Sequence, residues 1–104
     1  MGITVDYLQR YIKSKDFQPD KKEEYFMKLS EELGELARAM RKDLRPVTQG
    51  QVKNTVEEEL WDVIYYALAI ANTYGIELEQ VIPEKEKLNN EKYETGINFG
   101  DEVF

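Results

Sequence analysis

The sequence predicts an all-α protein, a bundle of four to five antiparallel helices built as a single domain over residues 1–104. Apolar residues recur at spacings of three and four, and no segment alternates between apolar and polar residues as a half-buried strand does. The predicted helices are joined by short loops, which favours antiparallel neighbours. Because a domain of 104 residues buries only a limited core, we expect it to assemble as a homodimer or homotetramer.

The first two helices are expected near residues 4–15 and 21–42. Asp20 as N-cap, with Glu23 three residues later, has the pattern of a capping box and indicates where the second helix begins. We expect the second helix to pack through an apolar stripe that contains Phe26, Leu29, Leu33, Leu36, Ala37 and Met40.

The third helix is expected to begin within residues 51–56, where Thr55 and Glu58 offer another capping box. It is expected to end at Tyr74, because Gly75 then stands at the C′ position.

The fourth helix is expected from about residue 77 to residue 93. Pro83 lies inside it and is expected either to kink the helix or to split off a short first turn. Residues 95–104 are predicted to form an irregular tail.

Composition excludes several classes of function. The 21 acidic and 14 basic residues give a net charge of −7, which opposes binding to nucleic acid. The lack of cysteine excludes thiol catalysis, and the lack of histidine removes the usual ligand for zinc, copper and iron. A metal site must therefore offer oxygen ligands, which suit Mg²⁺, Mn²⁺ or Ca²⁺. Without a membrane-spanning apolar run or a secretory signal, an unexported cytoplasmic protein is expected.

Asp62 lies in a helical segment, Leu60 to Ala71, that is otherwise apolar or aromatic on every side. Such a helix is normally buried all round, and an unpaired buried carboxylate is unfavourable by several kcal/mol. Glu59 lies on the same helical face, about 60° from Asp62. The pair therefore indicates a cation, a set of strong donors or a bound proton.

The second helix carries a matching acidic group, Glu31, Glu32 and Glu35, within an arc of about 100°. These like charges repel one another, and Gly34 between them weakens the helix unless a neighbouring helix or ligand approaches closely there. Taken alone, such a trio is typical of a solvated face, and it lies away from the apolar stripe. Together with Glu59 and Asp62, the spacing favours a hard divalent cation held between two helices.

The acidic residues also resemble a family signature. Glu31-Glu32-x-x-Glu35, followed after 23 residues by Glu59-x-x-Asp62, is similar to the EExxE…ExxD signature of MazG-like proteins, which belong to the all-α NTP pyrophosphohydrolases. The resemblance covers roughly residues 20–93. It extends to a fourth-helix K…N…(R/K)Y segment, matched here by Lys85, Asn89, Lys92 and Tyr93.

The resemblance implies a role for each matching position. Mg²⁺, with Mn²⁺ as a substitute, would be bound by Glu32, Glu35, Glu59 and Asp62. Glu31 would be a catalytic residue that binds, orients or deprotonates the attacking water, and Tyr66 would lie near the base. The phosphates would contact Lys85, Asn89 and Lys92. Core or dimer contacts, more than base stacking, are expected of Tyr7, Tyr11, Tyr25 and Tyr65.

The implied reaction is Mg²⁺-dependent hydrolysis of nucleoside or deoxynucleoside triphosphates to the monophosphate plus pyrophosphate, for house-cleaning or control of nucleotide pools. Two alternatives stay open: a relative dedicated to dCTP, dUTP or phosphoribosyl-ATP, and a non-catalytic helical interaction protein. A di-iron carboxylate bundle is disfavoured, because its Glu-x-x-His elements need histidine. The sequence also lacks the G-x-x-x-x-G-K-[ST] loop of P-loop enzymes.

Overall fold

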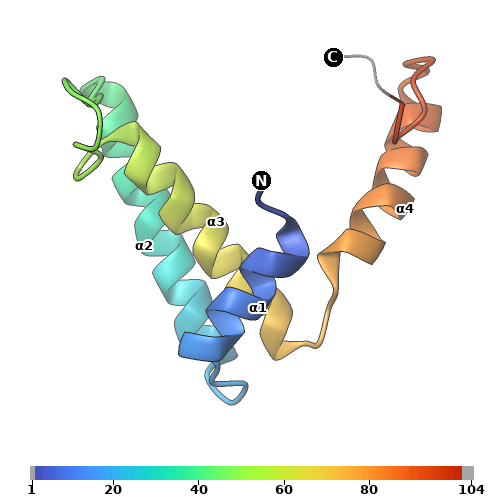
Figure 1. Cartoon of the computed structure of the whole chain (residues 1–104), viewed down its shortest axis with the longest axis horizontal. Coiled ribbons are helices and arrows are strands. Elements are labelled where there is room, and N and C mark those ends of the chain that lie inside the picture. Colours follow the sequence, from blue (N-terminus) through green and yellow to red (C-terminus); the bar gives the residue numbers. More distant parts are fainter. Residues whose placement is uncertain (1, 102–104) are drawn as a thin grey trace.

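A computed structural model describes residues 2–101 of the chain and contains four helices, with no strand among those residues. The helices are α1 (Val5–Lys15), α2 (Lys22–Arg41), α3 (Val56–Thr73) and α4 (Leu78–Lys92). Helices α2 and α3 form an antiparallel hairpin, α1 crosses the end of this hairpin, and α4 diverges from it (Figure 1). The predicted all-α class is confirmed. Within residues 2–101, no helix is long and apolar enough to cross a bilayer.

The ends of α1 and α3 follow from local sequence. Thr4 caps α1 by accepting a hydrogen bond from the Tyr7 N–H at 3.0 Å. Thr55 caps α3 in the same way, accepting from the Glu58 N–H at 3.3 Å. At the other end of α3, Gly75 adopts a φ of +67°, a left-handed conformation that glycine takes without strain.

The capping box predicted at Asp20 is wrong. Helix α2 begins at Lys22, and its N-cap residue Lys21 makes no side-chain capping bond. The Lys21 N–H donates to the Gln18 carbonyl at 2.9 Å, which closes a turn with Pro19 and Asp20 at its centre. Proline is favoured at the first central position of such a turn, so Asp20 serves the turn and not the helix.

The predicted packing face of α2 also needs correction. The stripe residues Phe26, Leu33 and Met40 are exposed, while Leu29 and Leu36 are only half-buried. The face that packs inward instead consists of Leu29, Leu36, buried Tyr25, buried Ala39 and half-buried Glu32. Because α2 carries apolar residues on two faces, their spacing alone does not identify the face that packs within the chain.

A small core at the crossing of α1, α2 and α3 holds the fold together. Its buried members are Ile12, Tyr25, Leu68 and Ala69. The buried side chain of Gln9 donates to the Ile76 carbonyl at 2.8 Å and accepts from the Leu78 N–H at 3.1 Å. Gln9 therefore fixes the direction in which the chain leaves α3 and begins α4.

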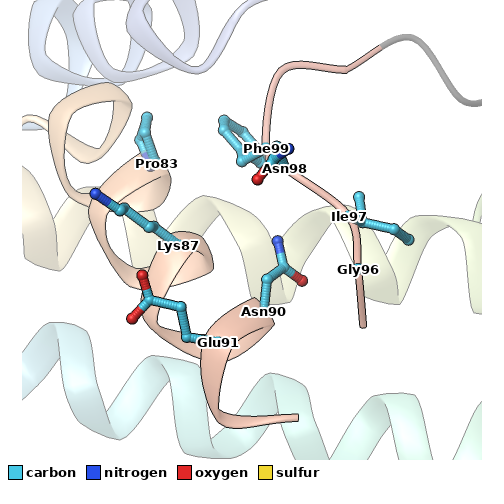
Figure 2. Close-up of a pocket in the computed structure, with 8 residues that line it drawn as sticks. All are labelled: Pro83, Lys87, Asn90, Glu91, Gly96, Ile97, Asn98 and Phe99. Carbon is cyan, nitrogen blue, oxygen red and sulfur yellow. The ribbon is translucent and has the colours of Figure 1, made fainter. Parts of the chain in front are cut away.

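Helix α4 stands apart from the α2–α3 hairpin. It contacts α1, Leu78 at its start packs on the core, and none of its residues is fully buried. It remains one helix through Pro83, so the predicted split of its first turn does not occur. Residues 95–101 form no helix and return beside α4 (Figure 2), while residues 102–104 of the predicted tail lie outside the described part of the chain.

Candidate functional site

Carboxylates from α2 and α3 converge between the two helices. Glu32 of α2 and Glu59 and Asp62 of α3 each place an oxygen such that these oxygens lie within 4.8 Å of one another. The i,i+3 spacing puts Glu59 and Asp62 on adjacent turns of one face, and Glu32 lies opposite them on the inward face of α2. We call Glu32, Glu59 and Asp62 the acid triad.

Glu59 is the most buried member of the acid triad. Only 7% of the residue is exposed, and its Oε2 atom has no hydrogen-bond partner among residues 2–101. The pKa of Glu59 is raised to about 7; burial is the largest cause, and the nearby carboxylates of Glu32 and Asp62 act in the same direction. A buried acceptor without a donor is unfavourable, so this oxygen needs a proton or a cation.

Asp62 shows the same electrostatic conflict. Its pKa is raised, first by burial and then by the negative charges of Glu32 and Glu58. The donor set contains only carboxylate oxygens, which hard divalent cations prefer. A divalent cation would remove the repulsion and occupy the free lone pairs, so the acid triad fits the Mg²⁺ site expected from the sequence.

Glu31 and Glu35 lie outside the acid triad. Glu31 is exposed and pairs with Lys28 one turn earlier, with 3.4 Å between Nζ and Oε2. Glu35 is exposed as well, and its Oε2 lies 3.9 Å from a guanidinium nitrogen of Arg38. In this conformation, two of the three predicted acids of α2 therefore face solvent, and only Glu32 joins the residues of α3.

Tyr66 lies one turn after Asp62, next to the acid triad. Burial raises the pKa of Tyr66, the positive charge of Lys28 opposes the shift, and the carboxylates of Glu32 and Asp62 add to it. The Tyr66 hydroxyl therefore lies within electrostatic reach of these carboxylates and of the Lys28 ammonium. Lys28 thus joins the surroundings of the site, although no sequence motif singled it out.

Asp16 organises the aromatic residues beside the acid triad and was also missed from the sequence. Its carboxylate accepts hydrogen bonds from the hydroxyls of Tyr25 at 2.8 Å and Tyr65 at 3.0 Å. Desolvation is the largest cause of the raised pKa of both phenols, and the hydrogen bond to Asp16 comes second. A signal did exist, because tyrosines on the inward faces of two helices need a partner for each hydroxyl.

The predicted phosphate-binding residues lie on α4, which contacts α1 and reaches the core only through Leu78 at its start, among the described residues. Lys85 is exposed beside Val81 and Leu88. Asn89 is half-buried and donates to Glu86 at 2.8 Å, and the Lys92 ammonium lies 5.2 Å from the centre of the Tyr93 ring. Within the described chain, this cationic group and the acid triad are not brought together.

A hollow of about 470 Å³ lies between α4 and the tail, with Pro83 and Lys87 on one side and Ile97 and Phe99 on the other (Figure 2). Among residues 2–101, Glu91 is the one carboxylate that lines it, and no member of the acid triad does. It lacks the ligands of a metal site, so the chemistry is better supported at the acid triad.

Comparison with known proteins gives one family. Residues 20–95 match the MazG nucleotide pyrophosphohydrolase domain, and no curated protein matches the chain. Two crystal structures of iMazG from Vibrio DAT 722 are each 43% identical, with a TM-score of 0.78. The Ctag-iMazG match covers 85% of this chain and 99% of that one, and the Ntag-iMazG match covers 88% and 98%. The family match contains the whole acid triad and all of α4, but not α1.

Proposed function

The chain belongs to the MazG nucleotide pyrophosphohydrolase family, and we propose that it hydrolyses nucleoside and deoxynucleoside triphosphates in the cytoplasm with Mg²⁺, or Mn²⁺ in its place. The products are the monophosphate and pyrophosphate, which suits house-cleaning or control of nucleotide pools. The acid triad carries this proposal, because the unpartnered Oε2 of buried Glu59 faces two further carboxylates.

Mg²⁺ would be held by Glu32, Glu59 and Asp62, with Glu35 as a further ligand after a change of its side-chain rotamer. When bound, Mg²⁺ would neutralise phosphate charge and make a coordinated water more acidic. The protein has a net charge of −7 and would otherwise repel a polyanionic substrate. The acid triad therefore gives an acidic protein a means of attracting a triphosphate.

The chain supplies the remaining steps through its own side chains. A water molecule attacks at the α–β phosphoanhydride, the P–O bond to the leaving pyrophosphate breaks, and the proton of the water passes to a carboxylate. We propose Glu31 for this proton, as orienting residue or base, because it lies next to Glu32 in α2 and is open to solvent. Tyr66 would contact the nucleoside beside the metal.

The phosphate-binding half of the site would come from a second copy of the chain. The α2–α3 hairpin exposes apolar side chains on both helices, among them Leu33 at 49% and Ile64 at 47%. Apart from the adjoining backbone of α2 and the two neighbouring residues, nothing among the described residues lies within 4 Å of where a side chain at Gly34 would begin, so this part of α2 is open to close approach. Exposed apolar surface of this kind marks an interface. A homodimer or homotetramer could then bring Lys85, Asn89 and Lys92 of one copy to the acid triad of another.

A nucleotide panel tests the proposal. The protein is incubated with each canonical ribo- and deoxynucleoside triphosphate at equal concentration, with Mg²⁺, with Mn²⁺ and with EDTA. We expect monophosphate and pyrophosphate in equal amounts with either metal, and no turnover with EDTA. Relative kcat/KM values separate a broad enzyme from one dedicated to a single nucleotide. Orthophosphate as the first product, or no product from any nucleotide, would refute the proposal.

A further inference from the structure

One flank of α1 carries two exposed aromatic rings. Tyr7 and Tyr11 stack with 6.3 Å between ring centroids and an interplanar angle of 12°, and they are 51% and 43% exposed. The neighbouring face of α1 contacts the core through Val5, Leu8 and Ile12. Both tyrosines are therefore held on a fixed helix and remain partly exposed to solvent.

A lysine ammonium joins this flank to α3. Lys15 Nζ lies 5.0 Å from the centre of the Tyr11 ring and 5.4 Å from the centre of the Tyr65 ring. It also lies 3.4 Å from the Tyr11 hydroxyl. Among residues 2–101, no carboxylate lies within ion-pair distance of Lys15. Its ammonium therefore keeps donor capacity for a ligand.

The aromatic contacts continue from Tyr65 to the acid triad. Tyr65 packs edge-on against Tyr66 with 5.1 Å between centroids, and Tyr66 lies one turn from Asp62 on α3. Asp16 holds the Tyr65 hydroxyl at 3.0 Å, which fixes the position of that ring. Tyr66, Tyr65 and the Lys15 ammonium thus link the surroundings of the acid triad to the exposed flank of α1.

We propose that Tyr7, Tyr11 and Lys15 form the subsite that binds the base of the nucleoside triphosphate. The planar base stacks on the Tyr11 ring in place of the Lys15 ammonium, which moves to the edge of the base and donates to ring nitrogen or carbonyl oxygen atoms there. The triphosphate then extends past Tyr66 to the acid triad. Base stacking on tyrosine is tolerant of base identity, so the selectivity between bases resides in Lys15.

This inference rests on the proposed function, because the subsite serves the same substrate. It adds to that function, since α1 lies outside residues 20–95 that match the family. The general chemistry then belongs to α2 and α3, and this chain's preference among bases belongs to α1.

The test compares Tyr11→Ala, Tyr11→Phe and Lys15→Met with a matched control. The control is Tyr74→Ala, which removes another exposed tyrosine under a lysine ammonium, with Lys22 Nζ 5.1 Å from its ring centre. Tyr74 lies twelve residues after Asp62, a distance of about 18 Å along the helix. Each variant is assayed with the nucleotide panel and for inhibition by imidodiphosphate, which contains no base.

For Tyr11→Ala we expect KM to rise about tenfold, equivalent to about 1.4 kcal/mol of binding, with little change in kcat or in the inhibition constant of imidodiphosphate. Tyr11→Phe keeps the ring and should retain the wild-type KM, and Lys15→Met should reduce the ratio of kcat/KM between the best and the worst base. The Tyr74→Ala control should match the wild type.

Several results would overturn the subsite. The first is that Tyr11→Ala weakens the binding of nucleotide and of imidodiphosphate equally. The second is that Tyr11→Ala leaves KM unchanged while Lys15→Met leaves the preference among bases unchanged. The third is that Tyr11→Ala changes the oligomeric state, which would make the flank a subunit contact. An active wild type combined with any of these results refutes the subsite alone. A wild type that is inactive on every nucleotide refutes the proposed function and the subsite with it.

Discussion

The α2–α3 hairpin and the α4 arm carry the two halves of the predicted site, and they differ in how they are packed. The hairpin holds Glu59 at 7% exposure, and the pKa values of Glu59 and Asp62 are both raised. The arm has no fully buried residue, and Lys85 lies on its open surface. One half is therefore organised within a single chain, and the other half is presented outwards.

The difference indicates which interactions are intramolecular. Carboxylates repel one another and hold together only when the helices around them pack firmly, which the core at Tyr25 and Leu68 provides. Cationic side chains such as Lys85 stay solvated until a phosphate is present. Under the proposed function, either another copy of the chain or a movement of the arm would bring the predicted cationic residues to the acid triad.

The largest expected effect is at Glu59. We expect Glu59→Gln to lower kcat about 1,000-fold, because several kcal/mol of stabilisation at the transition state depend on the bound cation. Without metal, the variant should be more thermally stable than the wild type, since a buried repulsive carboxylate is removed. Glu24→Gln, an exposed acid of α2 paired with Lys21 at 3.8 Å, is the control. Pyrophosphate release and thermal melts would measure both changes, and full activity in Glu59→Gln would contradict the metal site.

The second prediction concerns the arm. We expect Lys85→Ala to lower kcat/KM about 100-fold, because removing one group that stabilises charge in the transition state typically has an effect of this size. If the arm serves another copy, co-expression of Lys85→Ala with Asp62→Asn should restore about a quarter of wild-type activity, because half of the randomly formed dimers contain one intact site of two.

The matched control for this experiment is co-expression of Asp62→Asn with Glu59→Gln. Both substitutions affect the acid triad, so no pairing of these chains assembles an intact site, and activity should stay absent. If co-expression of Lys85→Ala with Asp62→Asn gives no more activity than this control, α4 folds onto its own hairpin.

The contrast between hairpin and arm also separates what the sequence could predict from what it could not. Asp62 was identified as a site residue because a charged side chain in an apolar helix conflicts with burial. Thr55 was identified as the N-cap of α3 and Gly75 as the residue that ends it, through local backbone chemistry. Glu32 was predicted as a ligand together with Glu35, but the sequence did not show that Glu32 alone of the α2 acids turns inward, since α2 has apolar residues on two faces and tertiary packing selects between them. The role of Asp16 was missed because the buried tyrosine hydroxyls indicate that an acceptor is needed but do not identify it, and Tyr65 lies 49 residues from Asp16.

The third prediction is a pH-dependent stabilisation by Mg²⁺. The folded-state pKa of Glu59 is raised to about 7 from an ordinary value of 4.5, so between these values the folded state binds more protons than the unfolded state. Its contribution therefore favours folding at low pH and is lost as pH rises. We expect Mg²⁺ to raise Tm more at about pH 8 than at about pH 5, because binding must displace the proton at low pH.

The difference between wild type and Glu59→Gln isolates this group from other titrations. The metal-free wild type should lose stability relative to Glu59→Gln as pH rises through about 7, and the variant should lack most of the Mg²⁺ effect at either pH. An Mg²⁺ shift of Tm that is equal at both pH values would separate metal binding from Glu59.

The smallest effect is expected at Glu35, which was predicted as a ligand but faces solvent beside Arg38 at 3.9 Å. Because it can join the acid triad only by changing rotamer, we expect Glu35→Gln to raise the Mg²⁺ concentration for half-maximal activity about tenfold, in the range typical of supporting groups around a metal. Saturating Mg²⁺ should restore most of kcat, unlike in Glu59→Gln. A loss as large as that of Glu59→Gln, not recovered at high Mg²⁺, would mean that Glu35 is an obligatory ligand. The hairpin would then also need a rearrangement before catalysis. The acid triad would no longer differ from the cationic residues of α4 in being already assembled within one chain.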